Sequence, residues 1–597
     1  MFNKAFSRRS FLQFTSKSVA AAVVSASVIG CIDSSDNNDT TEVENIIQLK
    51  FLHGIASGDP TADSVILWTR ITPDDATFSD PVVVSWELAT DEDFTNVLRN
   101  GSTDVSPETD YTLKVDAVGL DPNTRYYYRF ISNNVTSAVG ATKTLATGNI
   151  ESVKLAVMSC SNYPTGFFNV YDLASQQEQL DAVLHLGDYI YEYGADGYGA
   201  ENAEAMGRQV TPAGELLTLA DYRTRYALYR GDESLQRLHA TAPFITVWDD
   251  HEIANDAYVN GAENHDESEG DFEQRKLAAM QAYFEWLPIR AASLGDNQTI
   301  NRSFSFGDLV DIHTLDTRVV GRDKQLDYAD YTTAQGLDAE QFSADLLNPN
   351  RSMLGAEQLG WLQEKLASST SKWQVLAQQV LMGKMNLPAA IATQQMSIPE
   401  FAELAAIAQL AARASANDPT LTVDQLTLLQ ANQDRLTPEV MGLLQLPNIP
   451  YNLDAWDGYF VERETILGTA KNYNKNLVVL AGDTHNAWAN NLKDMNGNFV
   501  GVEFATASVT SPGLEQYLNI SEPEVPATEA GIKQLIDDLQ YLNVSDRGFM
   551  VVTFSSDEVV STWHFVDTIT TTSYQENSER QASLKFVHGT QGLTTVS

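Results

Sequence analysis

Short runs in which hydrophobic and polar residues alternate occupy the chain from Gln48 to about Leu145. Turn residues separate the runs, which include VILW at 65–68, VVVSW at 82–86, YTLKV at 111–115 and YYYRF at 126–130. Alternation with a period of two predicts strands with one buried face, and several such short strands are typical of a β-sandwich. We therefore predict a fibronectin type III-like β-sandwich domain over residues 48–148.

The pattern changes beyond Glu151, where continuous apolar runs alternate with longer helical segments. Such runs predict strands that are buried on both faces of a sheet, and ligands bind outside the carboxyl ends of strands in open α/β sheets. Because a polar cluster follows each of five runs directly, we expect the clusters to converge on one site. The pairs are 153–158 with Ser159-Cys160-Ser161, 182–186 with Gly187-Asp188, 244–248 with Asp249-Asp250-His251-Glu252, 310–315 with Asp316-Thr317-Arg318, and 477–481 with Gly482-Asp483-Thr484-His485.

These runs define an α/β catalytic domain, which we place at residues 149–567. Apolar residues at helical spacing predict a helix over 272–286, and the Ala-, Leu- and Gln-rich stretch of about 386–445 predicts a helical insertion between two strands. Residues 568–597 are rich in Ser, Thr and Gln. We expect this C-terminal tail to wrap the surface.

The N-terminal residues have the pattern of an export signal. Arg8 and Arg9 precede an uncharged apolar stretch at 18–30, which is shorter than the roughly 20 residues that span a bilayer. This pattern predicts a twin-arginine signal peptide over residues 1–30 and a periplasmic or cell-surface location. Gly30-Cys31 resembles a lipobox, so we expect Cys31 to be the lipidated first residue of the mature chain. The alternative is an ordinary signal peptide with a chance cysteine. Residues 31–47 read as a disordered acidic tether.

Charge narrows the range of partners. The 597 residues include 38 Lys and Arg against 80 Asp and Glu, a net charge of −42. Removing residues 1–30 deletes four basic residues and no acidic one, which takes the charge to −46. So acidic a chain argues against specific nucleic-acid binding, because nothing would neutralise phosphates along a groove. Anionic substrates would have to be captured by metal ions or by a few local cations.

The converging clusters contain hard and soft metal ligands. A thiolate from Cys160, a carboxylate from Asp188, a phenolate from Tyr191 and an imidazole from His485 would suit an iron(III) ion. The oxygens of Asp188, Asp250 and Asp483 suit a calcium-like ion better than zinc. The alternative for Cys160 is an inert buried thiol. Cys31 and Cys160 lie in very different sequence surroundings, so we do not expect a disulfide between them.

Together these motifs resemble PhoD-like alkaline phosphatases, which are metallophosphoesterases related to purple acid phosphatases. The resemblance covers nearly the whole chain after the tether and implies an αββα metallophosphoesterase catalytic domain. It also implies a calcium-dependent iron(III) enzyme that is exported by the twin-arginine route and hydrolyses phosphate esters. The matching segments are FLHGIASGDP at 51–60, SCS at 159–161, GDYIYE at 187–192, WDDHE at 248–252, LDTR at 315–318, WDGY at 456–459 and AGDTH at 481–485.

Carried over by position, the resemblance implies a role for each site residue. Asp188 is similar to the bridging carboxylate of the family, and Cys160 replaces the D-x-H of the wider superfamily at the first strand. The implied iron(III) ligands are Cys160, Tyr191 and His485, and the implied Ca(2+) ligands are Asp250 and Asp483. His251 would lie near the phosphate and the leaving group, Arg318 would clamp the phosphate with Arg322 as a second candidate, and Asp249 and Glu252 would orient ligands or cap the loop.

The implied reaction is the hydrolysis of small phosphate monoesters and diesters. A metal-bound hydroxide would attack the phosphorus in line, and a metal ion or His251 would offset charge on the leaving oxygen. Two alternatives remain. One is a phospholipase D-like or other specialised phosphodiesterase, which the same motifs permit. The other is a non-catalytic cell-surface binding lipoprotein that uses its β domain for adhesion, against which the intact ligand cluster argues.

Overall fold

Two large β-sheets form the centre of the computed structural model, which describes residues 47–596 apart from residues 292, 294, 296, 297, 334, 335 and 394. The predicted signal peptide, Cys31 and nearly all of the tether lie outside the described residues. The larger sheet has ten strands and the smaller has seven. Apolar side chains of both sheets, such as Val157 and Val478, belong to one buried cluster, so the sheets pack face to face.

The ten-stranded sheet joins segments from both ends of the chain. Its order is β28-β27-β26-β25-β11-β12-β13-β2-β3-β7. Parallel pairing holds together β11 (Ser152–Met158), β12 (Ala182–His185) and β13 (Phe244–Thr246), whose residues are almost all buried, as expected for continuous apolar runs. The C-terminal strands are β25 (Arg547–Ser555), β26 (Glu558–Val566), β27 (Ala582–Val587) and β28 (Thr594–Thr595), and the N-terminal strands are β2 (Ile55–Gly58), β3 (Ser64–Arg70) and β7 (Thr112–Val118).

The N-terminal region is β-rich, as predicted, but one of its two sheets is continuous with a sheet of the catalytic region. β2 pairs in parallel with β13 through Gly58 and Phe244, so one N-terminal sheet continues directly into the large sheet. The other sheet has the order β10-β8-β5-β6, with β9 beside β8. Its strands are β5 (Val82–Ala89), β6 (Val97–Val105), β8 (Arg125–Ser132), β9 (Val135–Thr136) and β10 (Gly140–Lys143), and a small pair is formed by β1 (Leu49–Lys50) and β4 (Thr72–Pro73).

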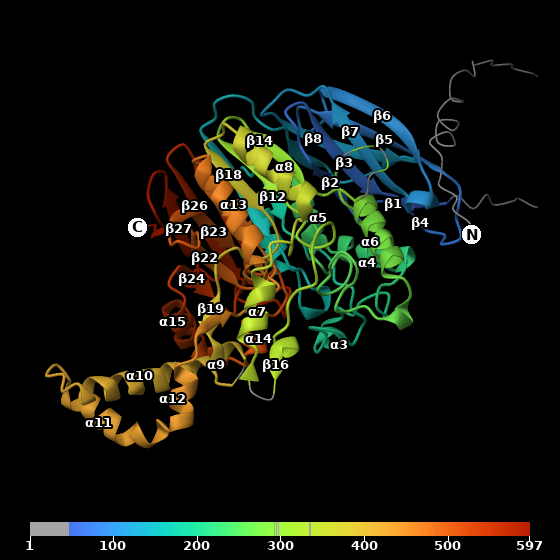
Figure 1. Cartoon of the computed structure of the whole chain (residues 1–597). Helices are drawn as coiled ribbons and strands as arrows, with labels where there is room; N and C mark the ends of the chain where they lie inside the picture. Colours follow the sequence, from blue (N-terminus) through green and yellow to red (C-terminus); the bar gives the residue numbers. More distant parts are fainter. Residues whose placement is uncertain are drawn as a thin grey trace, which may run out of the picture. The chain divides into compact units, whose positions relative to one another are not determined.

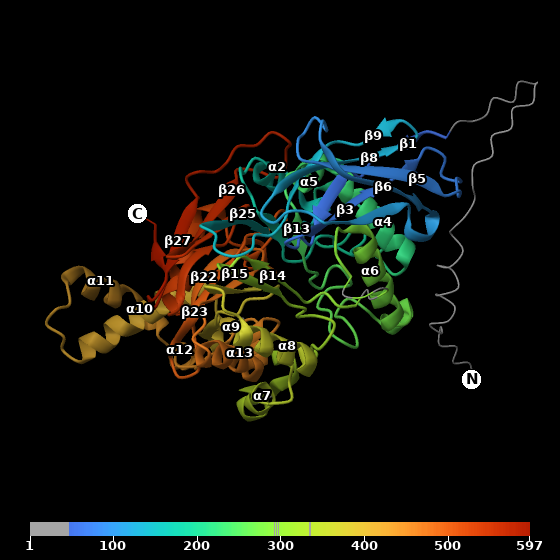
Figure 2. The same ribbon diagram turned by 90° about the horizontal axis from the view of Figure 1, so that it is seen from above.

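The seven-stranded sheet has the order β14-β15-β18-β21-β23-β22-β24. Four consecutive strands in this order run parallel to one another, namely β15 (Val310–Thr314), β18 (Trp373–Ala377), β21 (Leu477–Ala481) and β23 (Phe499–Ala505). The others are β14 (Arg302–Phe306), β22 (Ala487–Lys493) and β24 (Leu539–Asn543). Helices cover the outer faces of the two sheets (Figures 1 and 2), which gives the mixed α/β layering expected from the sequence.

The covering helices belong to two groups. Beside the ten-stranded sheet lie α2 (Asn169–Ser175), α4 (Leu219–Arg230), α5 (Glu233–His239) and α6 (Phe272–Trp286). A second buried cluster lies beneath α8 (Gly355–Ser368), α13 (Phe460–Asn472) and α15 (Val525–Leu535). Short elements in the connecting loops are α3 (Ala203–Met206), β16 (Thr332–Thr333), β17 (Gly336–Leu337), α7 (Ala339–Leu346) and α14 (Leu514–Tyr517). In the part of the chain described here, no helix combines the length and apolar character needed to cross a membrane.

Two peripheral segments complete the fold. The helical stretch anticipated near 386–445 is enclosed by the paired strands β19 (Asn386–Pro388) and β20 (Asn448–Pro450), and α10 to α12 project from the body in both views (Figures 1 and 2). Its helices are α9 (Ala389–Ala392), α10 (Ile398–Ser415), α11 (Val423–Asn432) and α12 (Pro438–Leu444). The C-terminal tail does more than wrap the surface, because β27 and β28 extend the edge of the ten-stranded sheet.

Candidate functional site

Four of the predicted metal ligands stand at sharp turns that follow buried strands. Cys160, Asp188, Asp483 and His485 have φ angles of 63°, 53°, 62° and 63°. A side chain in this left-handed region costs on the order of 1 kcal/mol, so the surrounding structure must hold each turn in place. The turns carry the side chains away from the strands and into the space at their carboxyl ends.

Gly187 makes the turn after β12 possible. Its φ is 102°, and a Cβ placed on it would lie 2.4 Å from the Cβ of Asp249. The backbone before Asp188 therefore approaches the loop after β13 as closely as only glycine allows. Glu252 fixes the same two loops, because its carboxylate accepts hydrogen bonds from the backbone N–H groups of Asp188 at 3.0 Å and Asp249 at 2.7 Å.

The first ligand group consists of Cys160, Asp188 and His485, whose ligand atoms all lie within 4.8 Å of one another. The Tyr191 hydroxyl donates to Oδ2 of Asp188 at 2.9 Å and lies 3.3 Å from Nε2 of His485. All four side chains are buried, and Oδ1 of Asp188 has no hydrogen-bond partner among the residues that the structure describes. A buried carboxylate oxygen without a partner is costly unless a cation occupies the space before it. The residues thus fit a metal ion.

Neighbouring groups orient this cluster. Nδ1 of His485 lies 2.5 Å from the carbonyl oxygen of Pro512, so a proton on Nδ1 is donated to that carbonyl and Nε2 is left free to bind a metal. The Tyr198 hydroxyl donates to the same carbonyl. Ser511 donates from Oγ to the Tyr191 hydroxyl at 2.6 Å.

Burial and negative charge keep two of these ligands protonated. Burial raises the pKa of the Cys160 thiol well above its usual range, and the nearby Asp188 raises it further. The pKa of Tyr191 is raised well above its usual range for the same two reasons. A thiolate and a phenolate can therefore exist here only if a cation supplies compensating charge.

A second group combines Asp188, Asp250 and His251, whose ligand atoms also lie within 4.8 Å of one another. Backbone N–H groups hold Asp250 in place, since Oδ1 accepts from His251 at 3.0 Å and Oδ2 accepts from Asp256 at 2.7 Å. Nδ1 of His251 is 2.7 Å from Oε2 of Glu192, and the His251 ring stacks on Tyr191 with the centroids 4.1 Å apart. Asp188 therefore belongs to both groups, as expected of a carboxylate that binds two neighbouring ions.

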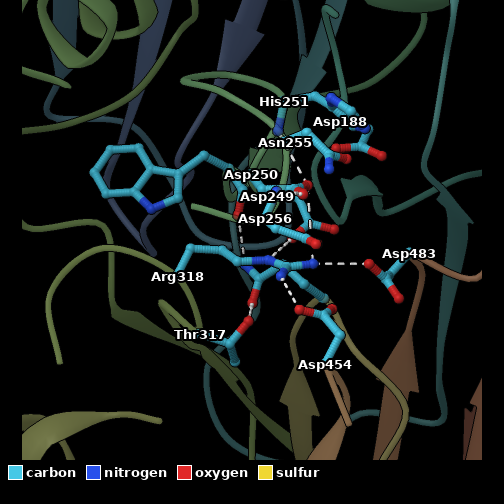
Figure 3. Close-up of polar contacts among 12 residues, drawn as sticks. Asp188, Asp249, Asp250, His251, Asn255, Asp256, Thr317, Arg318, Asp454 and Asp483 are labelled. Atoms are coloured by element: carbon cyan, nitrogen blue, oxygen red, sulfur yellow. Dashed lines mark hydrogen bonds and ion pairs between the residues drawn. The ribbon is translucent and has the colours of Figure 1, made fainter. Parts of the chain in front are cut away.

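Arg318 has other partners than the phosphate we predicted for it. Figure 3 shows its guanidinium surrounded by carboxylates: Nη1 donates to Asp454 at 2.7 Å, Nη2 donates to Asp483 at 2.7 Å, and Nε donates to Asp249. The Arg318 side chain is 0% exposed. Its donors are thus committed to carboxylates, and it positions them instead of facing a ligand.

The side chains of Arg322 and Asp249 are also buried. Nη2 of Arg322 donates to the backbone carbonyl of Asp454 at 2.8 Å and to the Asp454 carboxylate. Asp249 is 0% exposed and pairs with Arg318. Arg322 therefore also holds Asp454 in place, and among the described residues neither Arg322 nor Asp249 lines the cavity in front of the ligand groups.

A cavity of about 470 Å³ opens in front of the two ligand groups. Its walls contain five aspartates, two histidines and four tyrosines, and among the residues that the structure describes no Lys or Arg lines it. These aspartates, histidines and tyrosines are Asp188, Asp250, Asp256, Asp454, Asp483, His251, His485, Tyr193, Tyr198, Tyr451 and Tyr517. Cys160 and Tyr191 lie behind this wall, beside Asp188.

Several of these residues were missed by reasoning from the sequence. Asp454 stands two residues before the WDGY motif, which is the one hint that it belongs to the site. Asp256 follows Asp250 in the same loop and donates its backbone N–H to it. The tyrosines carry no local pattern, because they come from loops that meet only in the folded chain.

The chain is similar to known proteins over most of its length. A family model described as PhoD-like phosphatase matches residues 155–563, and one described as PhoD-like phosphatase, N-terminal domain, matches residues 37–146. The chain is 34% identical to alkaline phosphatase D of Bacillus subtilis (strain 168) over 524 residues, which cover 86% of this chain and 77% of that protein. The solved structure of PhoD matches with a TM-score of 0.72 and 32% identity and covers 92% of both chains. The longer family match includes every residue that lines the cavity.

Proposed function

Because the chain belongs to the PhoD-like phosphatase family, we propose that it is a metal-dependent enzyme that hydrolyses phosphate monoesters and diesters in the carboxylate-lined cavity, with an alkaline optimum. The observation that carries the proposal is the charge of the cavity. Five aspartates face it, and among the described residues no Lys or Arg does. A phosphate ester can bind there only if cations neutralise those carboxylates.

The donor atoms suggest which cations these are. Cys160, Asp188, Tyr191 and His485 combine a thiolate, a carboxylate, a phenolate and an imidazole, a set that suits iron(III). Asp250, Asp483 and the shared Asp188 provide only oxygens toward the cavity, which suits calcium. We propose these two sites, with Asp454 as an additional oxygen donor that the sequence did not reveal.

Different side chains at the cavity would contribute to different steps of hydrolysis. Bound cations would supply the positive charge that the phosphoryl oxygens require and would acidify water at the site. Arg318 fixes Asp454 and Asp483 so that both carboxylates keep their direction as substrate enters. As water oxygen bonds to phosphorus and the ester P–O bond breaks, the leaving oxygen needs a proton or positive charge, which His251 can provide from the cavity wall. Glu192 holds the His251 ring through Nδ1.

The proposal is tested with purified full-length protein supplied with iron(III) and calcium. We expect hydrolysis of 4-nitrophenyl phosphate and bis-(4-nitrophenyl) phosphate, loss of activity with a chelator, and loss of at least a hundredfold in kcat for Asp188→Asn. Asp537→Asn, at an exposed position away from the cavity, is the matched control and should retain full activity. Absence of hydrolysis with both metals present would refute the proposal, and a panel of monoesters, nucleotides and phospholipids would separate it from a specialised phosphodiesterase.

Colour tests the iron site independently of activity. A tyrosinate bound to iron(III) absorbs visible light, so we expect a coloured protein whose band is lost in Tyr191→Phe and retained in Tyr193→Phe. Tyr193 lines the cavity but is not among the proposed ligands. A colourless, iron-free sample with full activity would contradict the iron assignment while leaving metal-dependent hydrolysis standing.

We further propose that the chain is exported by the twin-arginine pathway and anchored through Cys31. The support is the Arg8-Arg9 pair, the short apolar stretch after it and the Gly30-Cys31 junction. Replacing both arginines by lysine should retain the protein in the cytoplasm. Cys31→Ala should release exported protein from the membrane fraction, and if it stays membrane-bound the lipid anchor is wrong.

A further inference from the structure

A second cavity, of about 620 Å³, adjoins the carboxylate-lined one, because Tyr451 and Tyr517 belong to the walls of both. We call it the apolar groove. It lies between the base of the helical insertion and the segment 517–528, and Glu524 is the charged residue in its wall. The apolar side chains that line it are Ile391, Met396, Ile398, Pro399, Leu518 and Ile520.

Stacked rings connect the first ligand group to this groove. The Tyr198 ring is nearly parallel to the His485 ring, with the centroids 6.1 Å apart, and Tyr517 is parallel to Tyr198 within 5° at 6.3 Å. Tyr517 is nevertheless 60% exposed. A flat aromatic surface is thus held open to solvent at the point where the two cavities meet.

The two cavities have opposite chemical character, as do the two halves of many phosphate esters. The phosphoryl group belongs among the carboxylates and the cations they would hold, and the rest of the ester must then extend along a wall of the cavity. An apolar chain gains from leaving water, by up to about fourfold in affinity for each methylene buried. A charged or strongly hydrated group gains nothing from the apolar lining.

We propose that the apolar groove binds the leaving group of the substrate, so that the preferred substrates are phosphate esters whose leaving group carries an apolar ring or chain. The inference rests on the proposed function and specifies its substrate class. Tyr517 and Tyr451 contact the first atoms beyond the ester oxygen. Leu518, Ile520 and Ile398 contact the more distant carbons.

A series of 4-alkylphenyl phosphates, from hydrogen to hexyl, tests the groove. The leaving phenols are of similar acidity, so the chemistry of bond cleavage stays constant while the apolar length changes. In the metal-loaded full-length enzyme we expect kcat/KM to rise by about two- to fourfold per added carbon over the first few carbons. Leu518→Glu places a charge in the groove and should flatten this rise, which is read as kcat/KM for each ester relative to phenyl phosphate in the same variant.

Leu428→Glu is the matched control, because Leu428 lies in α11, is 49% exposed and is absent from the groove wall. It should keep the wild-type dependence on chain length. A flat series in the wild type, or an unchanged rise in Leu518→Glu, would overturn the inference. If phenyl phosphate itself is not hydrolysed, the proposed function fails instead. The groove is then tested by calorimetry with alkylphosphonates, and equal affinity for methyl- and hexylphosphonate would overturn it.

Discussion

The guanidinium of Arg318 donates from Nη2 to Oδ1 of Asp483 at 2.7 Å, which joins a fully buried cation to a carboxylate in the cavity wall. Nη1 of the same guanidinium donates to Asp454 at 2.7 Å, and Nε donates to Asp249. Burial opposes the charge of Arg318, but the carboxylates of Asp249 and its neighbours raise its pKa well above the usual range. One buried cation thus holds carboxylates from three separate loops.

Replacing Arg318 by methionine should destabilise the metal-free protein. Its removal leaves buried carboxylates without their counter-charge, which typically costs about 3–5 kcal/mol in the free energy of unfolding. Urea unfolding in the presence of a chelator measures the change. The control is Arg435→Met, whose pair with Glu403 is solvent-exposed and should contribute little to the free energy of unfolding. If stability is unchanged and only KM rises, Arg318 would be the phosphate clamp that the sequence suggested.

Gly187→Ala should abolish activity and destabilise the fold. The added Cβ would lie 2.4 Å from the Cβ of Asp249, and φ is 102°, so the loop that carries Asp188 must move. Thermal unfolding and metal content should both fall. Gly360→Ala is the opposite case, because Gly360 lies in α8 with open space around it, and alanine there should stabilise the helix by about 0.5–1 kcal/mol. A Gly187→Ala variant with normal activity would show that the close approach of the two loops is unnecessary.

The sequence could predict the parts of the site that depend on local structure. Gly187 before Asp188, and Gly482 before Asp483, both follow continuous apolar runs, and each aspartate does turn off the end of a buried strand. Parallel pairing brings the carboxyl ends to one edge within each sheet, and the packing of the two sheets against each other brings the two sets of ends together.

Other features depend on contacts between distant segments and left no local pattern. The local sequence around an arginine that follows a strand is the same whether its side chain contacts phosphate or three carboxylates. The partners of Arg318 could therefore not be predicted from the LDTR segment at 315–318. The pairing of β2 with β13 is equally long-range, and it depends on Gly58, where a Cβ would lie 2.4 Å from the carbonyl oxygen of Pro288. The sequence therefore predicted an N-terminal β domain but not its continuation into the catalytic sheet.

Acid should destabilise the protein through His53. Burial, with Arg70 and Arg230 adding to it, lowers the pKa of His53 from 6.5 to about 3. The unfolded chain binds a proton below pH 6.5 but the folded chain does not until about pH 3, so stability falls as pH decreases through this window, by up to about 1.4 kcal/mol per pH unit. Above pH 7 His53 contributes no pH dependence.

His53→Asn tests this because asparagine stays neutral and retains an acceptor for Arg70 and Thr72, which approach Nδ1 at 3.3 and 3.2 Å. The free energy of unfolding is measured from pH 7.5 to pH 5 in both proteins. The variant should lose less stability than the wild type on acidification. Parallel curves would mean that His53 does not take up its proton on unfolding.

Asp188 connects the two ligand groups, and its substitution should change stability in opposite directions with and without metal. In the metal-free protein its carboxylate adds negative charge beside Asp250, so Asp188→Asn should raise the free energy of unfolding by on the order of 1 kcal/mol. Metal ions at a hundred times their Kd would stabilise the wild type by about 2.7 kcal/mol, and the variant should lose most of that gain.

Unfolding of wild type and Asp188→Asn with a chelator, and then with iron(III) and calcium, measures both effects. The variant should be the more stable protein in chelator and the less stable one in metal. Asp537→Asn, at an exposed position, should show no such reversal. Equal destabilisation in both conditions would mean that Asp188 acts through its hydrogen bond from Tyr191 alone, because that contact is present whether or not a cation is bound. The reversal therefore separates a metal ligand from a buried structural carboxylate without any measurement of activity.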